Sequence, residues 1–288
     1  MKTTKKIRIA IQKSGRLNED SIRMLKECGI DFNNGVNMLK ATAHNFPMEV
    51  LFLRDDDIPE YVAQGVADIG IVGENVLVES GADVKTIERL GYGKCRLSIA
   101  IPKGKKYAGV KSLQGKRIAT TYKNVLQKFL RKEKVTAEIH EISGSVEIAP
   151  GIGLADAICD IVSSGSTLFM NGLQEVETVM QSEAVLIGGK NLSAGGLKII
   201  EKLLFRIRAS RTAKHNKYVL LNAPNNQLDK ICKLIPGMKS PTVLPLVEPG
   251  WSSVHSVIDE DKFWDIIEQL RDAGAQGILV VPIEKMVI

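Results

Sequence analysis

A strand, loop and helix order repeats along the first half of the chain. An alternating stretch with Ile7, Ile9 and Ile11 predicts a strand with one buried face, and residues 18–29 predict a helix that ends near Gly29. Apolar segments at 48–53 and 67–73 predict further strands, the second opening through glycine into another helix. This order predicts the α/β class with a mostly parallel sheet.

The chain changes character near residue 100. The strand expected at 95–102 runs into the basic segment 102–109, which predicts a crossover to a second lobe. That lobe is expected to contain three strands, at 116–122, 137–143 and 156–162, and a helix at 123–134. A second helix, rich in Leu, Val and Glu, is expected after the last of these strands. A return strand is expected at 182–187. Two lobes joined by crossing segments predict a ligand cleft between them.

The last 72 or so residues follow a different pattern. Four strands are expected, at 217–223, 242–247, 252–258 and 277–283. One helix is expected after the first strand, at 225–237, and another after the third strand, at 259–274. In the first of these helices Leu228, Ile231, Cys232 and Ile235 share one face. This order predicts a ferredoxin-like βαββαβ domain. No catalytic pattern occurs in it, which favours a regulatory or assembly role.

Composition excludes several classes of protein. With 288 residues, 44% hydrophobic residues and 25% charged residues, the chain has the composition of a soluble globular protein. No apolar run approaches the roughly 20 residues that span a bilayer, and the N-terminus does not resemble a signal peptide, so we expect no membrane partner and a cytoplasmic location. The net charge of +6 is dispersed, with short clusters at 103–106 and 206–211. A polyanionic small molecule suits these clusters better than a nucleic acid does.

The four cysteines and four histidines do not occur at the spacings of a metal site. No CxxC or HxxxH pair is present, so structural zinc is not expected and the cysteines are interpreted as buried, reduced thiols. The identity of any metal ligands stays open at this stage.

The stretch at 153–173 is the most informative for chemistry. Asp156 and Asp160 are four residues apart, so on a strand they point to the same side, with Ile158 between them. A turn of small and hydroxyl-bearing residues follows directly before a helix: Ser163, Ser164, Gly165, Ser166 and Thr167. Such a turn can bind a phosphate through backbone N–H groups and hydroxyls. The simpler interpretation is an N-cap turn; the two carboxylates upstream favour a phosphorylated ribose.

Several segments, in this order, resemble the long form of the ATP phosphoribosyltransferase family. DAICDIVSSGSTL at 156–168 is similar to the family's phosphoribosyl pyrophosphate loop. The likeness extends over essentially the whole chain, through QKSGRL, LRDDDIP, DIGIVGENVL, LGYGKCRLSIAIP, SGSVEIAP, SPTVLPL and ILVVPIEKM. So many segments in the family's order make the resemblance specific.

The resemblance implies a bilobal catalytic unit, similar to periplasmic solute-binding proteins, followed by a ferredoxin-like regulatory domain that binds histidine. The implied domains are a first lobe at 1–103 with 184–212, a second lobe at 104–183, and a regulatory domain at 213–288. The implied glycosyltransferase reaction is the first step of histidine biosynthesis, feedback-inhibited by histidine. It joins N1 of ATP to phosphoribosyl pyrophosphate and gives N1-(5-phosphoribosyl)-ATP and pyrophosphate. Mg²⁺ bound through substrate phosphates, and dimers that gather into hexamers, are also implied.

The resemblance also assigns candidate site residues. Asp156 and Asp160 are expected to hold the ribose and act in catalysis, and residues 163–167 to bind the 5-phosphate. ATP is expected to lie mainly against the first lobe, near Lys13, Gly15, Arg16, Arg54, Asp68, Gly73, Glu74, Cys95 and Arg96. Thr242, Val257 and Gly277 are the expected histidine site. For the basic residues the alternative is a surface ion pair, and for the histidine site it is a set of core and turn positions; Glu147 receives no role.

Two other functions fit part of this pattern. A bilobal solute-binding protein would share the cleft, but it would carry an export signal and lack the phosphate loop. Another phosphoribosyltransferase, acting on a pyrimidine or a nicotinate, would share the loop and differ in the acceptor base. The loop does not distinguish between acceptor bases.

Overall fold

The computed structural model describes residues 6–33, 35 and 38–288. Contacts divide the chain into two compact units, 1–26 with 30–200 and 27–29 with 201–288. The division falls within the longest helix, α6 (Ala194–Lys214), which is earlier than the expected domain start at residue 213.

The first sheet of the larger unit has six strands in the order β2-β3-β1-β4-β11-β5. Their bounds are Ile7–Gln12 for β1, Lys40–Thr42 for β2, Met48–Leu53 for β3, Ile69–Gly73 for β4, Lys85–Arg89 for β5 and Ala184–Gly188 for β11. The accompanying helices are α1 (Arg16–Glu27), α2 (Ile58–Ala63) and α3 (Glu74–Ser80). Ile58 and Val62 of α2 pack against Ala10, Val72 and Ile187 of the sheet. Burial of these apolar side chains holds α2 on the sheet.

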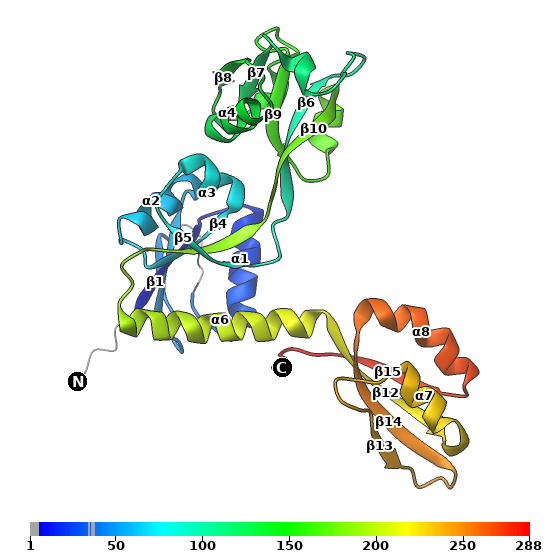
Figure 1. Cartoon of the computed structure of the whole chain (residues 1–288). Coiled ribbons are helices and arrows are strands. Elements are labelled where there is room, and N and C mark those ends of the chain that lie inside the picture. Colours follow the sequence, from blue (N-terminus) through cyan, green and yellow to red (C-terminus); the bar gives the residue numbers. More distant parts are fainter. Residues whose placement is uncertain (1–5, 34, 36–37) are drawn as a thin grey trace, which may run out of the picture. The chain divides into compact units, whose positions relative to one another are not determined.

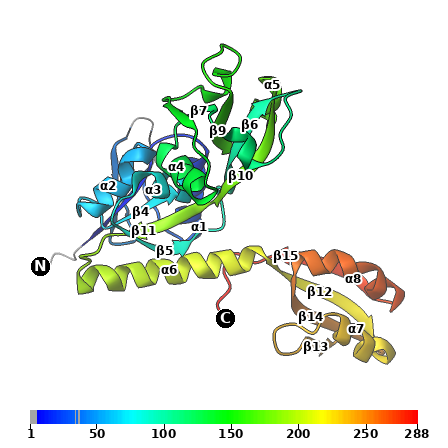
Figure 2. The same ribbon diagram turned by 45° about the horizontal axis from the view of Figure 1, so that its top comes forward.

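The second sheet of the same unit has five strands in the order β10-β6-β9-β7-β8. The bounds are Cys95–Pro102 for β6, Arg117–Thr120 for β7, Glu138–Glu141 for β8, Ala157–Val162 for β9 and Leu173–Ser182 for β10. Its helices are α4 (Lys123–Lys132) and the short α5 (Ser166–Met170). Figures 1 and 2 show β6 and β10 as the two long neighbouring strands of this sheet. Leu126 and Leu130 of α4 pack on the buried residues Ile99 and Ile118.

Both sheets are mixed, so the expectation of a mostly parallel arrangement is wrong. β1 pairs in parallel with β3 and β4, and β7 with β8 and β9, whereas β2, β5, β6, β10 and β11 make antiparallel pairs. The parallel pairs come from the strand and helix repeats. The antiparallel strands β6, β10 and β11 are the segments that cross between the sheets, and their direction depends on pairing that local sequence does not specify.

Two further expectations differ from the structure in this region. The segment rich in Leu, Val and Glu after the phosphate loop forms the strand β10 rather than a helix, because Gly172 ends the short α5 and pairing with β6 follows. β6 belongs to the second sheet, although the expected first lobe reached residue 103. The return strand expected at 182–187 is confirmed as β11.

The smaller unit contains a four-stranded antiparallel sheet in the order β13-β14-β12-β15. The strands are β12 (Asn216–Pro224), β13 (Thr242–Pro245), β14 (Trp251–Asp259) and β15 (Gln276–Pro282). Helices α7 (Leu228–Leu234) and α8 (Glu260–Asp272) pack on one face of this sheet (Figure 1). On that face Ile231, Phe263 and Leu270 form a buried cluster with Val219 and Val254. Asp259 caps α8 by accepting from the N–H groups of Asp261 and Lys262. The predicted βαββαβ arrangement is confirmed.

Within the described residues, no helix is long and apolar enough to cross a membrane. All four cysteines are in the reduced form; Cys28 and Cys159 are buried, and Cys95 and Cys232 are partly exposed. Burial raises the pKa of the Cys28 thiol to about 11, so this thiol stays protonated and unreactive at neutral pH.

Candidate active site

The predicted phosphate loop, residues 163–167, lies at the carboxyl end of β9, a central strand of the second sheet. The buried side chains of Val162 and Leu168 anchor the two ends of the bend, and the hydroxyl-bearing residues between them are exposed. Gly165 has a φ of +82°, a left-handed conformation that glycine adopts without strain. The hydroxyl oxygens of Ser164 and Ser166 lie 3.0 Å apart. The bend can therefore bring backbone and hydroxyl groups close to an anion.

The helix after the loop is shorter than the sequence indicates. α5 has five residues, so its dipole adds less to anion binding than that of a full helix. The Ser166 N–H already donates to Ser164 Oγ at 3.4 Å. Hydroxyls and the remaining backbone N–H groups are thus the main donors that the loop could offer to a phosphate.

Asp160 precedes the loop on β9 and lies among other acidic groups. Burial raises the pKa of its carboxyl, and the negative charge of Glu147 adds to the rise. Burial also raises the pKa of Tyr122, and the negative charges of Asp160, Asp55 and Asp56 contribute to that rise. A partly buried carboxylate with Glu147 as an acidic neighbour suits a site where positive charge binds or develops.

Asp156 lies one residue before β9, at the opposite end of the strand from the loop. Its carboxylate binds Arg117: the Arg117 backbone N–H donates to Oδ2 at 3.0 Å and Nη2 to Oδ1 at 3.2 Å. The Arg117 guanidinium holds the pKa of the Asp156 carboxyl below its usual value. The two aspartates therefore share a face but are about 13 Å apart along the strand. The structure brings Asp160 to the loop and gives Asp156 a partner on β7.

We expect Asp156→Asn to lower the thermal unfolding midpoint by no more than about 2 °C at neutral pH, because solvent screens a partly exposed ion pair and its contribution to stability is small. A carboxyl with a lowered folded-state pKa stabilises the protein above the unfolded pKa, near 3.9, and loses this effect as the pH falls through the lower folded value. The difference between the proteins should therefore narrow below about pH 4. Thermal unfolding followed by circular dichroism measures this. A fall in kcat with unchanged stability would instead support the predicted ribose contact.

Arg96 lies beside the phosphate loop of the second sheet rather than with the other ATP candidates. Its Nε and Nη2 donate to the two carboxylate oxygens of Glu175 on β10, each at 2.5 Å. Its Nη1 donates to the carbonyl oxygen of Ser163 at 3.3 Å. The buried Ser98 hydroxyl donates to Glu175 at 2.8 Å. Glu175, which the sequence did not single out, therefore orients an arginine that contacts the first residue of the loop.

Replacing Glu175 by glutamine is expected to raise the KM for the phosphoribosyl donor about tenfold, because loss of one charge-assisted pair loosens Arg96 by about 1.4 kcal/mol. The KM for ATP should change less. Steady-state kinetics with each substrate varied separately measures this split. Glu177→Gln is the matched control, since Glu177 lies on the same strand and accepts from the Tyr107 hydroxyl instead. Equal effects of the two substitutions would remove the positioning role from Glu175.

Apart from Cys95, the remaining ATP candidates lie on or next to strands of the first sheet. Lys13 and Gly15 lie after β1 and line a cavity of about 660 Å³ together with Asn18, Phe52 and Leu39. Arg16 begins α1, Arg54 follows β3, and Cys95 begins β6, opposite Ser182. Asp68 lies just before β4 and accepts from the Arg8 backbone N–H at 2.7 Å, so it joins β4 to β1. Gly73 and Glu74 lie at the other end of β4.

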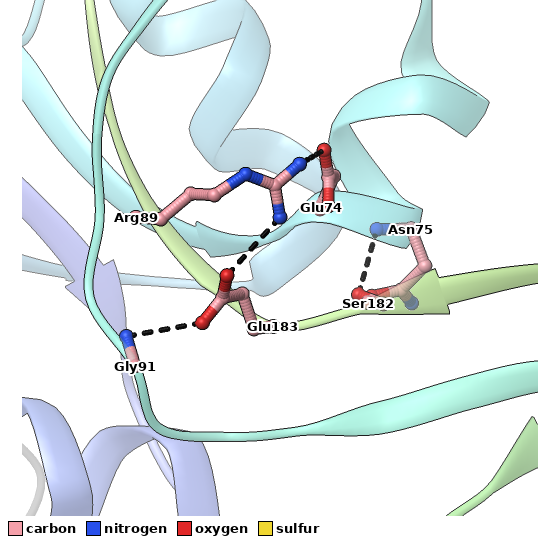
Figure 3. A network of polar contacts seen from close by, with 6 residues as sticks. All are labelled: Glu74, Asn75, Arg89, Gly91, Ser182 and Glu183. Carbon is pink, nitrogen blue, oxygen red and sulfur yellow. Dashed lines mark hydrogen bonds and ion pairs between the residues drawn. The ribbon is translucent and has the colours of Figure 1, made fainter.

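A polar network surrounds the junction of β4 and α3 (Figure 3). Arg89 lies between two carboxylates, binding Glu74 and, at 3.1 Å, Glu183. Glu183 also accepts from the Gly91 N–H at 3.1 Å. The Ser182 hydroxyl donates to Oδ1 of the buried Asn75 at 2.7 Å. The backbone N–H of Asn75 in turn donates to the Ser182 hydroxyl oxygen at 3.1 Å. The predicted ATP residue Glu74 is therefore part of the junction where the crossing strands leave the first sheet.

Contacts between the two sheet regions involve residues that the sequence analysis missed. The Asn75 side-chain amide donates to the Tyr122 hydroxyl at 3.0 Å. Glu79 of α3 accepts from the backbone N–H groups of Asn124 and Val125, at 2.8 and 2.9 Å, and so caps α4. A cavity of about 290 Å³ opens here, lined by Asp56, Val76, Glu79, Ser80, Thr121, Tyr122, Glu141, Ile142 and Ser143. Its acidic lining matches the negative surroundings of Asp160.

The predicted histidine residues lie in the sheet of the smaller unit. Thr242 begins β13 and pairs with His255 of β14, and Val257 lies on the same face of β14 as His255. His255 bonds the Tyr218 hydroxyl through Nδ1 at 3.0 Å and the Ser253 hydroxyl through Nε2 at 2.9 Å. Gly277 lies at an irregularity of β15, with a φ of +57°. Thr242 and Val257 thus share the face opposite α7 and α8, and their predicted role stays a prediction.

These features define an α/β protein in which a central strand ends in a bend of exposed hydroxyls, followed by a separate ferredoxin-like unit at the C-terminus. Residues 54–209 match the profile of the ATP phosphoribosyltransferase family (HisG), and residues 213–285 match the profile of the HisG C-terminal domain. The chain therefore belongs to the ATP phosphoribosyltransferase family. It is a transferase of the first step of histidine biosynthesis, whose substrates are ATP and phosphoribosyl pyrophosphate.

Individual relatives agree with this assignment. An ATP phosphoribosyltransferase of Cytophaga hutchinsonii is 59% identical over 98% of both chains. One of Bacteroides thetaiotaomicron is 56% identical over 98% of this chain and all of its own length. A chain from the HisG:HisZ complex of Thermotoga maritima aligns with a TM-score of 0.60 and 29% identity, covering 70% of this chain and 98% of its own. A periplasmic sulfonate-binding protein of Methylobacillus flagellatus, 15% identical with a TM-score of 0.50 over 72% and 68% of the chains, shares the fold.

Proposed function

We propose that the enzyme joins N1 of the adenine of ATP to C1 of phosphoribosyl pyrophosphate, giving N1-(5-phosphoribosyl)-ATP and pyrophosphate. The N1 lone pair of adenine is free at neutral pH, so it attacks C1 without a base, and the bond from C1 to the pyrophosphate oxygen breaks. Positive charge grows on the ribose ring as pyrophosphate leaves, as in other glycosyl transfers. Electrostatic stabilisation of this charge is the main demand on the protein.

In this proposal the loop 163–167 binds the 5-phosphate of the donor, and Asp160 faces the ribose. The carboxylate offsets the developing positive charge and holds a ribose hydroxyl. The observation that carries the assignment is the placement of Asp160, with its raised pKa, directly before a bend of exposed hydroxyls and a glycine of positive φ. The carboxylate, loop and Arg96 pair all belong to the second sheet.

ATP is proposed to bind against the first sheet, where Lys13 and Gly15 line a cavity at the end of β1. The negatively charged triphosphate would lie near the cations of the first sheet. The adenine would lie near the acidic cavity that Tyr122 and Asp56 line. The second candidate function, a bilobal binding protein, has no observation in its favour beyond the shared fold.

Mg²⁺ is proposed to accompany the substrates rather than to reside in the protein. Among the described residues, no three His, Cys, Asp or Glu side chains are placed to hold a metal ion. When bound to the pyrophosphate group, Mg²⁺ neutralises departing charge. The acidic groups Asp55, Asp56 and Glu147 near Asp160 and Tyr122 are compatible with a cation carried in on the donor.

Histidine is proposed to inhibit the enzyme by binding the smaller unit, near Thr242, Val257 and Gly277, and dimers are proposed to gather into hexamers. A separate ferredoxin-like unit supports a regulatory role for this region. Inhibition requires that histidine bind one of two states of the enzyme more tightly than the other.

One assay tests the proposed reaction. The purified chain is incubated with phosphoribosyl pyrophosphate, ATP and Mg²⁺, and the ultraviolet absorbance change of N1-substituted adenine is followed. Product should form with Mg²⁺, fail to form in excess EDTA, and form more slowly when histidine is added. Replacing ATP by a pyrimidine or nicotinate acceptor should give no product; turnover with such an acceptor and none with ATP would contradict the proposal.

A further inference from the structure

A second cavity lies at the edge of the five-stranded sheet opposite the phosphate loop. It has a volume of about 310 Å³ and lies where β6 ends at Pro102 and where β7 and β9 begin, at Arg117 and Ala157. Seven residues of extended chain separate Asp156, in its wall, from Ser163 in the loop, which is roughly 20 Å. The cavity is therefore separate from the proposed donor site.

Four cations line this cavity: Lys105, Lys106, Lys116 and Arg117. The only carboxylate in its wall is Asp156, which Arg117 already neutralises, and Arg117 Nη1 also donates to the Gly153 carbonyl at 2.9 Å. Across the described part of the chain, no ion pair involves any of the three lysines. The lining therefore carries four cations against the single carboxylate of Asp156, a net positive charge that an anion would stabilise.

The nearby Lys103 shows that this convergence is not a property of the whole basic segment. Its ammonium lies 3.5 Å from the ring centroid of Phe169, on α5, and it does not line the cavity. Within this segment only Lys105 and Lys106, which follow the turn at Gly104, line the cavity. The segment 103–106, which the sequence marked as a basic cluster, therefore divides between two environments.

The inner wall of the cavity is apolar. Ile101, Leu113 and Ala157 are buried there. Tyr107 also lines the cavity, and its hydroxyl donates to Glu177 at 2.9 Å, so the ring is held in place. Planar groups such as nucleobases pack well on a fixed aromatic ring. A volume near 300 Å³ lies at the lower end of the range for small-molecule sites.

We propose that this cavity, built from Lys105, Lys106, Lys116, Arg117 and Tyr107, binds a small phosphorylated molecule as a second anion site of the enzyme. The phosphate lies against the lysines, and any nucleobase of the ligand packs on Tyr107. The shared chemistry is a phosphate group, whether it comes as an inorganic ion or on a nucleoside. This inference does not depend on the proposed reaction.

Calorimetric titration with inorganic pyrophosphate, without Mg²⁺, tests the proposal. The wild-type chain should bind pyrophosphate at the cavity in addition to the proposed substrate phosphate sites at the loop and near Lys13. Lys105→Gln with Lys116→Gln should weaken one of these sites at least tenfold. The matched control, Lys128→Gln with Lys132→Gln on α4, removes the same charge from exposed positions outside the cavity and should leave every site intact. Equal binding by the two double variants would overturn the proposal.

A second arm separates the two sources of phosphate and the two sites. Uridine 5′-monophosphate and inorganic phosphate are compared as ligands. If wild type binds the nucleotide more tightly and Tyr107→Leu does not, the ligand is a nucleoside phosphate. If wild type binds the two equally, the site recognises the phosphate group alone. Gly165→Val should remove the loop site and keep the cavity site. If Gly165→Val instead removes no binding while the lysine variant does, the proposed donor site fails and the cavity proposal stands.

Discussion

Gly165→Val is expected to raise the KM for phosphoribosyl pyrophosphate by roughly 10- to 100-fold, since hydrogen bonds to a charged group contribute about 1.5–3 kcal/mol. Gly165 has a φ of +82°, and a β-branched residue strongly disfavours that conformation. The bend must therefore shift, which would move its N–H groups away from the proposed position of the 5-phosphate. An added Cβ itself would meet only Val162 Cγ1, at 3.9 Å, so the effect comes from the backbone rather than from a clash in the core.

Gly250→Val provides the control for this substitution. Gly250 has a φ of +85° and no atom within 4 Å of an added Cβ, and it lies in the smaller unit. Both variants should lose similar stability, because the backbone strain is similar. Steady-state kinetics should show a raised donor KM for Gly165→Val alone. A normal donor KM in a folded Gly165→Val protein would show that the loop does not bind the donor phosphate.

Asp160→Asn is expected to lower kcat about a hundredfold, comparable to the loss of one preorganised electrostatic partner in other enzymes. The same substitution should raise stability. A carboxyl whose folded-state pKa lies above its unfolded value opposes folding once the pH exceeds the unfolded pKa, near 3.9 for Asp. At neutral pH the charged Asp160 is therefore destabilising, and a neutral amide removes that cost. Lower activity together with higher stability is the expected signature.

Two measurements check the role of Asp160. As the pH is lowered, kcat should fall with an apparent pKa higher than the ordinary pKa of Asp, because burial and Glu147 raise the pKa of Asp160. This fall in kcat at acid pH should be absent in Asp160→Asn. Denaturant unfolding of Asp160→Asn and Asp156→Asn should give changes of opposite sign, since Arg117 lowers the pKa of Asp156. An unchanged kcat in a folded Asp160→Asn protein would remove this carboxylate from the mechanism.

The sequence predicted the features that depend on local patterns. The predicted phosphate loop, residues 163–167, follows a buried strand and contains small residues. The βαββαβ unit shows helix and strand periodicities with clear ends. The parallel core of the first sheet follows from its strand and helix repeats. Each of these features is encoded within a few dozen residues.

Features that depend on distant partners were not predictable in the same way. β10 contains the apolar and acidic residues of an amphipathic helix, and its pairing with β6 decides its conformation. α6 was missed because apolar residues lie around its circumference: Leu203 and Ile207 are buried while Phe205 is exposed. The partner of Asp156 and the contacts of Glu79 join elements that lie far apart in the sequence. No spacing rule connects such positions.

The position of β11 in the first sheet has a consequence for how the chain folds during synthesis. β11 pairs with β4 and β5, and its partners in β4 precede it by more than a hundred residues. All five strands of the second sheet are translated between β4 and β11. The first sheet can close only after the ribosome has released that intervening sequence, so its early strands wait with an unpaired edge. Loop closure over this distance should make completion of the first sheet a slow step of folding.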